Sequence, residues 1–226
     1  MSEKLSIIRR AFLDILPLSL PAVPFGFVVG LAIIEAGVNP VVGWSSSWII
    51  FGGAAQLTLI SLLGSGAAVT AAIGAALVVN ARHLMYSGAI APSFQNQPRW
   101  MQLFGPYLLI DQVFAVAMLR RNDHPDVFRI YYLTVGVTFW FVWQVMTGVG
   151  LLFGPMVPDS WHLHFAIPIM FIGLVVMGID QFPKLLAAIV GAVITLACAD
   201  LPNRSGLLVG AMAGIFSGVV AERIKR

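Results

Sequence analysis

Long apolar runs separated by short polar segments dominate the sequence. A helix that crosses a membrane needs about 20 mainly apolar residues. Runs of this kind predict about eight transmembrane helices, and the fourth and seventh of them are short: 13–34, 42–63, 67–91, 104–119, 130–153, 163–179, 185–199 and 206–220. No segment between them has the composition of a soluble domain. We therefore predict an all-α integral membrane protein with a single polytopic domain over residues 1–226.

The composition excludes a soluble protein. Hydrophobic residues make up 59% of the chain and charged residues 10%, and the mean hydropathy is +0.91. Because a soluble domain carries about 25% charged residues, the main solvent of this chain must be lipid. The single cysteine, Cys198, leaves no disulfide framework and no cysteine metal site.

The basic residues stand mostly at the ends of the predicted spans, which is typical of membrane topology rather than of nucleic-acid binding. With eight spans and a cytoplasmic N-terminus, most of them face the cytoplasm. Only Arg99 and Arg204 then face outside, and Arg82 lies within a span. Since lysine and arginine favour the cytoplasmic side, we predict that both termini are cytoplasmic and that the membrane is the bacterial cytoplasmic (inner) membrane.

Prolines interrupt the first predicted span. Pro17, Pro21 and Pro24 precede Gly26 within a short stretch. Each proline removes an N–H donor and disturbs the helix one turn earlier, so we predict that this helix is broken. Broken helices often form the substrate sites of transporters, and a simple structural kink is the alternative.

A dense polar cluster lies in the third predicted span. It consists of Asn80, Arg82, His83, Tyr86 and Ser87. An arginine inside an apolar run is costly and usually faces the interior of a helix bundle, and the histidine could relay protons. This cluster indicates a functional site. The alternative is that Arg82 and His83 satisfy helix ends near the outer surface.

Two further polar positions lie in neighbouring spans. Asp111 and Gln112 stand in the fourth, and Gln56 follows two glycines near the middle of the second. At 1.5 Å per residue, Arg82 and Asp111 both lie about 8–10 Å below the outer surface. We therefore predict an Arg82–Asp111 ion pair, or a pair bridged by substrate. Gln56 is a candidate pathway residue or a structural bond between helices.

These motifs resemble the AzlC family, the large subunits of branched-chain amino-acid exporters. The resemblance rests on Pro24-Phe-Gly26, on Gly53-Ala-Ala-Gln56 and above all on the segment Asn80-Ala-Arg82-His83 that continues to Ser87. It implies export of valine, leucine and isoleucine, with methionine as a further candidate. The proton gradient would drive the export, and a small membrane subunit of the AzlD type would be the partner.

The resulting prediction is a secondary transporter of amino acids, and an aspartate or histidine would carry the proton. The family pattern in the fourth span usually has a glutamate where this chain has Gln112. The predicted substrate and proton pathway consists of Pro21, Pro24, Gly26, Gln56, Asn80, Arg82, His83, Tyr86, Asp111 and Gln112.

Two alternatives to transport remain open at this point: a passive channel, or an assembly or regulatory membrane subunit. The sequence has no P-loop, no zinc-protease motif and no cysteine or histidine cluster at metal spacing. We therefore predict no enzyme, no cofactor and no metal site. Gly210, Gly214 and Gly218 form a ridge of small residues that indicates close helix packing, either within the chain or with another subunit.

Overall fold

The structure is a computed structural model, and it describes residues 3–156, 158, 179, 181–200 and 205–225. All regular structure among these residues is helical. The chain divides into two compact units, Met1–Ile167 and Pro168–Arg226, which are described separately. The sixth predicted span, residues 163–179, lies almost wholly outside the described residues.

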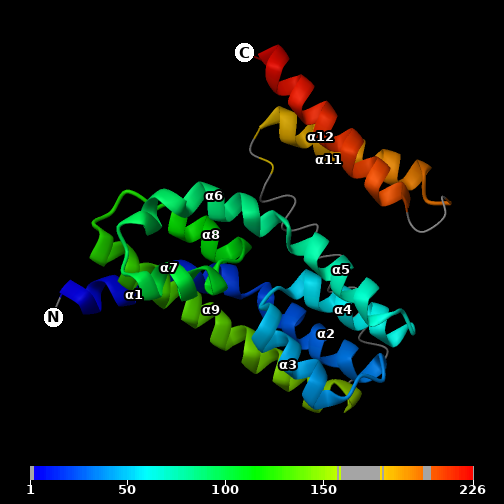
Figure 1. Cartoon of the computed structure of the whole chain (residues 1–226), viewed down its shortest axis with the longest axis horizontal. Coiled ribbons are helices and arrows are strands. Elements are labelled where there is room, and N and C mark those ends of the chain that lie inside the picture. Colours follow the sequence, from blue (N-terminus) through cyan, green and yellow to red (C-terminus); the bar gives the residue numbers. More distant parts are fainter. Residues whose placement is uncertain (1–2, 157, 159–178, 180, 201–204, 226) are drawn as a thin grey trace. The chain divides into compact units, whose positions relative to one another are not determined.

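The first predicted span is a bent pair of helices. Helix α1 (Glu3–Ser19) ends just before Leu20, and α2 (Ala22–Glu35) begins just after Pro21, at an angle of 59°. The break predicted from the prolines is therefore confirmed. Helix α2 then follows the long α9 (Pro125–Phe153), as Figure 1 shows. The two helices approach closely because Gly30 packs on the backbone of α9 and Gly150 packs on the backbone of α2.

The second predicted span does not cross the unit. It forms α3 (Pro40–Ile50) and α4 (Gly53–Gly64), and the chain reverses between them at Phe51, which is in the left-handed region at φ 39°. Gly43, near the start of α3, packs on Ile33, and Gly64, at the end of α4, packs on Ala36. Both ends of this segment therefore lie beside the end of α2, so the segment forms a re-entrant hairpin and not one continuous helix.

The third predicted span forms a second bent pair of helices. Helices α5 (Val69–Asn80) and α6 (Arg82–Gln95) meet at Ala81 at an angle of 41°. By length and composition, the described residues contain one continuous helix that could cross a membrane, α9. The pairs α1–α2 and α5–α6 could each cross as one bent span. The structure therefore does not support the predicted number of eight spans.

The fourth predicted span also turns back. Helix α7 (Arg99–Phe104) and the 3-10 helix η1 (Gly105–Leu108) run in the opposite direction to α6. Two contacts show this direction: Gly105 packs on Phe94 near the end of α6, and Leu109 lines one pocket with Ser87 near its start. Helix α8 (Asp111–Met118) then returns, and beyond it the Arg121 carbonyl accepts a hydrogen bond from Ser93 Oγ at 2.9 Å. This segment is a second re-entrant hairpin.

The hairpins change the predicted distribution of charge. Gln97 Nε2 donates to the Pro125 carbonyl at 2.9 Å, so the loop before Arg99 lies at the same end of the unit as Arg129. We call this the basic end, because it gathers Lys4, Arg9, Arg10, Arg99, Arg120, Arg121 and Arg129. Residues 35–69, which form the opposite or far end and its hairpin, contain no lysine or arginine. The predicted placement of Arg99 opposite the other arginines is thus wrong.

The two halves of the first unit repeat one order of elements in opposite directions. In the first half (α1–α4) a bent pair leads to the far end, and the α3–α4 hairpin returns to the middle. In the second half (α5–α8) a bent pair leads to the basic end, and the α7–η1–α8 hairpin returns to the middle. The hairpin tips meet there, with the rings of Phe51 and Tyr107 5.8 Å apart.

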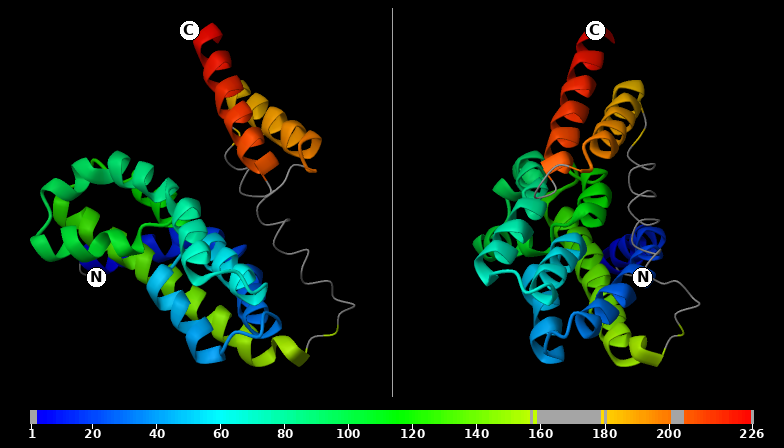
Figure 2. Two further views of the ribbon diagram at one scale, coloured as in Figure 1. Left: turned by 45° about the vertical axis from the view of Figure 1, so that its right-hand side comes forward. Right: turned by 90° about the vertical axis from the view of Figure 1, so that its right-hand side faces the viewer.

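The second unit contains α11 (Phe182–Ala197) and α12 (Ser205–Lys225), which pack side by side in both views of Figure 2. They correspond to the seventh and eighth predicted spans. Gly214 lies against Ala187 and Gly191, and Gly210 lies against Thr195. The predicted ridge of small residues therefore packs within the chain.

Candidate functional site

The predicted ion pair is present where two helices begin. Arg82 is the first residue of α6 and Asp111 is the first residue of α8. Arg82 Nη2 lies 3.0 Å from Asp111 Oδ2, and the Tyr86 hydroxyl donates to Asp111 Oδ1 at 2.6 Å. Both charged side chains are mostly buried, with 30% and 24% of their surfaces exposed. The pair thus joins the second bent span to the tip of the second hairpin.

The helix dipoles act differently on the two charges. The N-terminus of a helix carries a partial positive charge, which stabilises an anion and disfavours a cation. Asp111 is therefore held favourably by α8, whereas Arg82 stands against the field of α6. A second anion at this place would relieve Arg82, because both the guanidinium and the start of α6 attract negative charge.

Unpaired polar atoms gather beside this pair. Asn80 Oδ1, Arg82 Nε and His83 Nε2 are buried and have no hydrogen-bond partner. Nearly all buried polar groups in proteins are hydrogen-bonded, so these three atoms keep unused capacity to bond a ligand. The Tyr86 ring stacks on Phe114 with centroids 4.5 Å apart, and the centroid of the His83 ring lies 5.8 Å from that of Tyr86. The site is therefore polar, partly unsatisfied and framed by aromatic rings.

The tip of the first hairpin, between α3 and α4, contains no charged residue. Gly53, the first residue of α4, packs against the rings of Phe25 and Trp143, which meet edge to face at 5.4 Å. The adjacent Gly52 faces the amide of Asn80, since a Cβ there would lie 2.9 Å from Asn80 Oδ1. The absence of a side chain at Gly52 thus lets the first hairpin approach the charged pair.

A second polar group joins this hairpin to α9. Gln56 Nε2 donates to Ser46 Oγ at 3.0 Å and to Ser47 Oγ at 2.5 Å, and Gln144 Nε2 donates to the Ser47 carbonyl at 3.1 Å. All four residues are buried. Gln56 was predicted from the sequence, whereas Ser46, Ser47 and Gln144 were not, although three consecutive serines and a glutamine within apolar runs are visible there.

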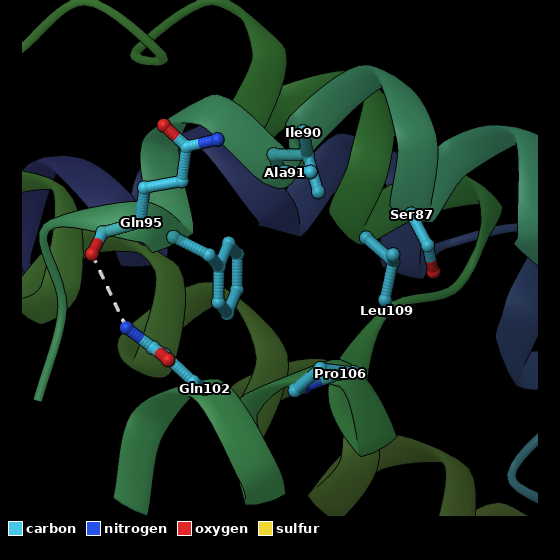
Figure 3. Close-up of a pocket in the computed structure, with 8 residues that line it drawn as sticks. Ser87, Ile90, Ala91, Gln95, Gln102, Pro106 and Leu109 are labelled. Carbon is cyan, nitrogen blue, oxygen red and sulfur yellow. Dashed lines mark hydrogen bonds between the residues drawn. The ribbon is translucent and has the colours of Figure 1, made fainter. Parts of the chain in front are cut away.

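Two cavities flank the middle of the unit. One, of about 540 Å³, lies between α3, α4 and α5; its lining is mainly valine, isoleucine and leucine, and it includes Asn80 and Ser46. The other, of about 300 Å³, lies between α6 and the α7–η1 arm, as Figure 3 shows. Its lining includes Ser87 from α6 and Leu109 from the hairpin tip, each within two residues of the Tyr86–Asp111 bond. One cavity thus lies next to the charged pair on the side of the first hairpin, and the other lies next to it on the side of the second hairpin.

The other predicted site residues lie in different places. Pro21 and Pro24 are exposed, and Gly26 is buried against Met146 of α9. Gln112 is half-buried next to Asp111. The structure therefore brings five of the predicted residues together in one site: Asn80, Arg82, His83, Tyr86 and Asp111. Gln56 lies in the first hairpin, whose tip approaches this site, and the two prolines lie outside it. Among the described residues, no group of histidine, cysteine, aspartate or glutamate could hold a metal ion.

Comparison with known proteins gives one family. The family model described as AzlC protein matches residues 17–157. An uncharacterized membrane protein of Archaeoglobus fulgidus is 26% identical over 94% of both chains. An uncharacterized membrane protein of Helicobacter pylori is 24% identical over 89% of this chain and 88% of its own. No solved structure matches the chain.

Proposed function

The chain belongs to the AzlC family of membrane proteins, and we propose from this that it exports branched-chain amino acids across the bacterial cytoplasmic membrane. The proposed substrates are valine, leucine and isoleucine, with methionine as a further candidate. The chain would act with a small AzlD-type membrane subunit and would be driven by the proton gradient. It would be a transporter and not an enzyme.

The Arg82–Asp111 pair is the observation that carries the proposal. An amino acid is a zwitterion, so its carboxylate can bind Arg82 and the start of α6 while its ammonium binds Asp111. When the substrate leaves, the two side chains can pair with each other at the observed 3.0 Å. In both states each charge has a partner, which avoids the large cost of an isolated charge in a low-dielectric interior.

The cavities support an aliphatic substrate. The larger one is lined mainly by branched apolar side chains and has Asn80 at its edge, next to Arg82. A ligand whose charged groups lie at the helix breaks could therefore place a valine or leucine side chain among residues of similar polarity. The burial of that side chain would contribute about 1.5–3 kcal/mol of binding free energy.

The opposed hairpins support alternating access. Transporters with inverted repeats place their site between the repeats and move one repeat against the other. In this chain each hairpin reaches the middle from a different end and bounds one cavity. We propose that each hairpin closes one side of the pathway, and that Asp111 or His83 carries the coupled proton. Positive charge favours the cytoplasm, so the basic end would be cytoplasmic.

Reconstituted transport tests the proposal. The chain and its small subunit would be placed in proteoliposomes, and the flux of labelled leucine would be measured with and without a pH gradient. Arg82→Gln and Asp111→Asn should each lower the flux on the order of 100-fold, because each removes the charged partner of one end of the substrate, and truncation of one partner of a buried charge pair costs about 2–5 kcal/mol of binding free energy. Arg10→Gln is the matched control, since Arg10 is exposed and lies 4.0 Å from Asp14 in α1.

Full flux in both site variants, at unchanged insertion into the membrane, would refute the proposed site. Leucine flux that is independent of the pH gradient would favour a passive channel. Absence of leucine flux in the wild type, while the two subunits assemble, would favour an assembly or regulatory role.

A further inference from the structure

The uncharged polar group between the first hairpin and α9 has more oxygens than donors. We call it the oxygen cluster; it consists of Ser46, Ser47, Gln56, Gln144 and Thr147. Ser47, Gln56 and Thr147 are 0% exposed and Gln144 is 4% exposed. Three of its buried atoms, Gln56 Oε1, Gln144 Oε1 and Thr147 Oγ1, have no hydrogen-bond partner.

The hydrogen bonds fix which amide atom of each glutamine is left unpaired. Gln144 lies against the carbonyl oxygen of Ser47, which can only accept, so the amide must present its nitrogen there. Ser46 uses its single hydroxyl proton on the Gly43 carbonyl, so its oxygen can only accept from Gln56. The two amide oxygens are thus left free by the chemistry of their neighbours, and a flip of either amide would place acceptor against acceptor.

Two helix ends lie beside the oxygen cluster and act in opposite directions: α3 ends there with unpaired carbonyls, whereas α4 begins there with unpaired N–H groups one turn before Gln56. Ser46 and Ser47 lie toward the C-terminal end of α3, where unpaired carbonyls carry a partial negative charge. Gln144 and Thr147 are three positions apart on α9, so their side chains are neighbours on the surface of that helix. Unpaired buried acceptors destabilise the folded chain, and a bound cation would satisfy several of them together.

We infer that the oxygen cluster is a binding site for a monovalent cationic group. Neutral oxygens suit this ligand because they replace its hydration shell without holding it as tightly as a carboxylate would. Ends of broken helices and their carbonyls bind sodium ions in several transporters. The same chemistry fits two sources, a sodium ion or the ammonium group of an amino acid. Only the second source rests on the proposed function, and it would place the ammonium at the oxygen cluster instead of at Asp111.

Binding of sodium to the purified chain tests the inference without any substrate. Saturable binding of radioactive sodium would be measured on the full chain in lipid nanodiscs, with choline replacing sodium at constant ionic strength. We expect Thr147→Val and Gln144→Leu to weaken sodium binding at least tenfold and Thr147→Ser to restore it. Thr147→Val is nearly isosteric and removes one oxygen, which keeps the test valid if Gln144→Leu does not fold.

Matched controls remove a hydroxyl elsewhere on the same helices. Thr58→Val on α4 and Thr134→Val on α9 each delete a hydroxyl that bonds only to its own helix, to the Ala54 and Ile130 carbonyls. Both controls should bind sodium as the wild type does.

A second measurement identifies the ammonium source. In transport-competent proteoliposomes, leucine and its analogue without the amino group, 4-methylpentanoate, would compete against labelled leucine. If the ammonium is the ligand, the preference for leucine over the analogue should fall at least tenfold in Thr147→Val. No saturable sodium binding together with an unchanged preference in the variants would overturn the inference and leave a cluster that holds water only. A failed proposed function would appear separately, as absent leucine flux in the wild type.

Discussion

Helices α6 and α8 begin with Arg82 and Asp111, whereas their counterparts in the first half, α2 and α4, begin with Ala22 and Gly53. The two charges of the second half thus correspond to two small apolar residues in the first. Around Gly53 the rings of Phe25 and Trp143 fill the space, and beyond them lies the oxygen cluster. Around Asp111 there are an arginine, a tyrosine hydroxyl and unpaired buried atoms.

The difference shows how one backbone arrangement can support two kinds of polar site. Two ion pairs within one membrane unit would double the cost of desolvating charge. A charged site in the second half and a neutral site in the first half confine that desolvation cost to the second half. Both hairpins still end at polar groups. We infer that the second half binds its ligand through charged side chains and that the first half offers only neutral oxygens. Three predictions test this contrast.

The largest expected effect is all-or-none labelling by a thiol reagent that cannot cross the membrane. Ser65 lies in the loop after α4 and Asn96 in the loop after α6, and both are exposed. In a Cys198→Ser background, Ser65→Cys should be labelled from outside intact cells and Asn96→Cys only after the cells are opened. The reason is that the halves are inverted and positive charge keeps the basic end inside.

Eight full crossings would give the opposite labelling at both positions. That result would show that the hairpins cross the membrane in the cell, and the contrast between two inverted halves would be lost. Cys198→Ser alone, which leaves no cysteine in the chain, is the control for background labelling.

The second prediction concerns motion of each hairpin. A Cβ at Gly43 would lie 3.2 Å from Ile33 Cβ, and a Cβ at Gly136 would lie 2.8 Å from Leu108 Cβ. With small shifts these pairs reach the separation of about 3.5–4.5 Å that a disulfide needs. Ile33→Cys with Gly43→Cys would tie the first hairpin, and Leu108→Cys with Gly136→Cys would tie the second.

We expect each disulfide to abolish leucine flux and a reductant to restore it, because alternating access requires both hairpins to move. Single-cysteine variants are the controls. Inhibition by only one disulfide would sharpen the contrast, since it would identify one hairpin as the gate and the other as scaffold. Flux that survives both disulfides would contradict gating by either hairpin.

The sequence was sufficient to predict helices, the break at Pro21 and the Arg82–Asp111 pair, because each depends on local chemistry. Proline disrupts a helix wherever it stands, and an arginine in an apolar run needs a partner. The predicted depth of Asp111 nevertheless depended on a wrong path of the chain. The eight-span scheme brings the chain to Asp111 from the side opposite the basic end, whereas in the structure the second hairpin brings it from the basic end.

The hairpins could not be predicted from hydropathy alone. Two apolar helices of 11 and 12 residues joined by a short turn, as in α3 and α4, have the same composition as one span. The distinguishing features are the length of each arm, which is typical of re-entrant segments, and the turn itself. At that turn Gly52 and Gly53 permit the close approach of Asn80 and Trp143. These are tertiary contacts, which a linear pattern does not contain.

The smallest expected effect comes from one hydroxyl. Tyr86→Phe removes the hydrogen bond to Asp111 and leaves the ring stacked on Phe114. A hydrogen bond to a charged group contributes about 1.5–3 kcal/mol, and part of this should be recovered because Asp111 keeps Arg82. We therefore expect the apparent affinity for leucine to fall about tenfold, measured from the concentration dependence of flux.

Tyr107→Phe is the comparison within the same protein. The Tyr107 hydroxyl donates to the Trp48 carbonyl and accepts from Trp140 Nε1, so it joins neutral groups near the hairpin tips. Its removal should change the affinity for leucine less than Tyr86→Phe does, because no charged site residue loses a partner. Equal losses of affinity in the two variants would mean that both hydroxyls act only by holding the hairpins in place. The charged site of the second half would then contribute no more to substrate binding than the neutral groups near the hairpin tips.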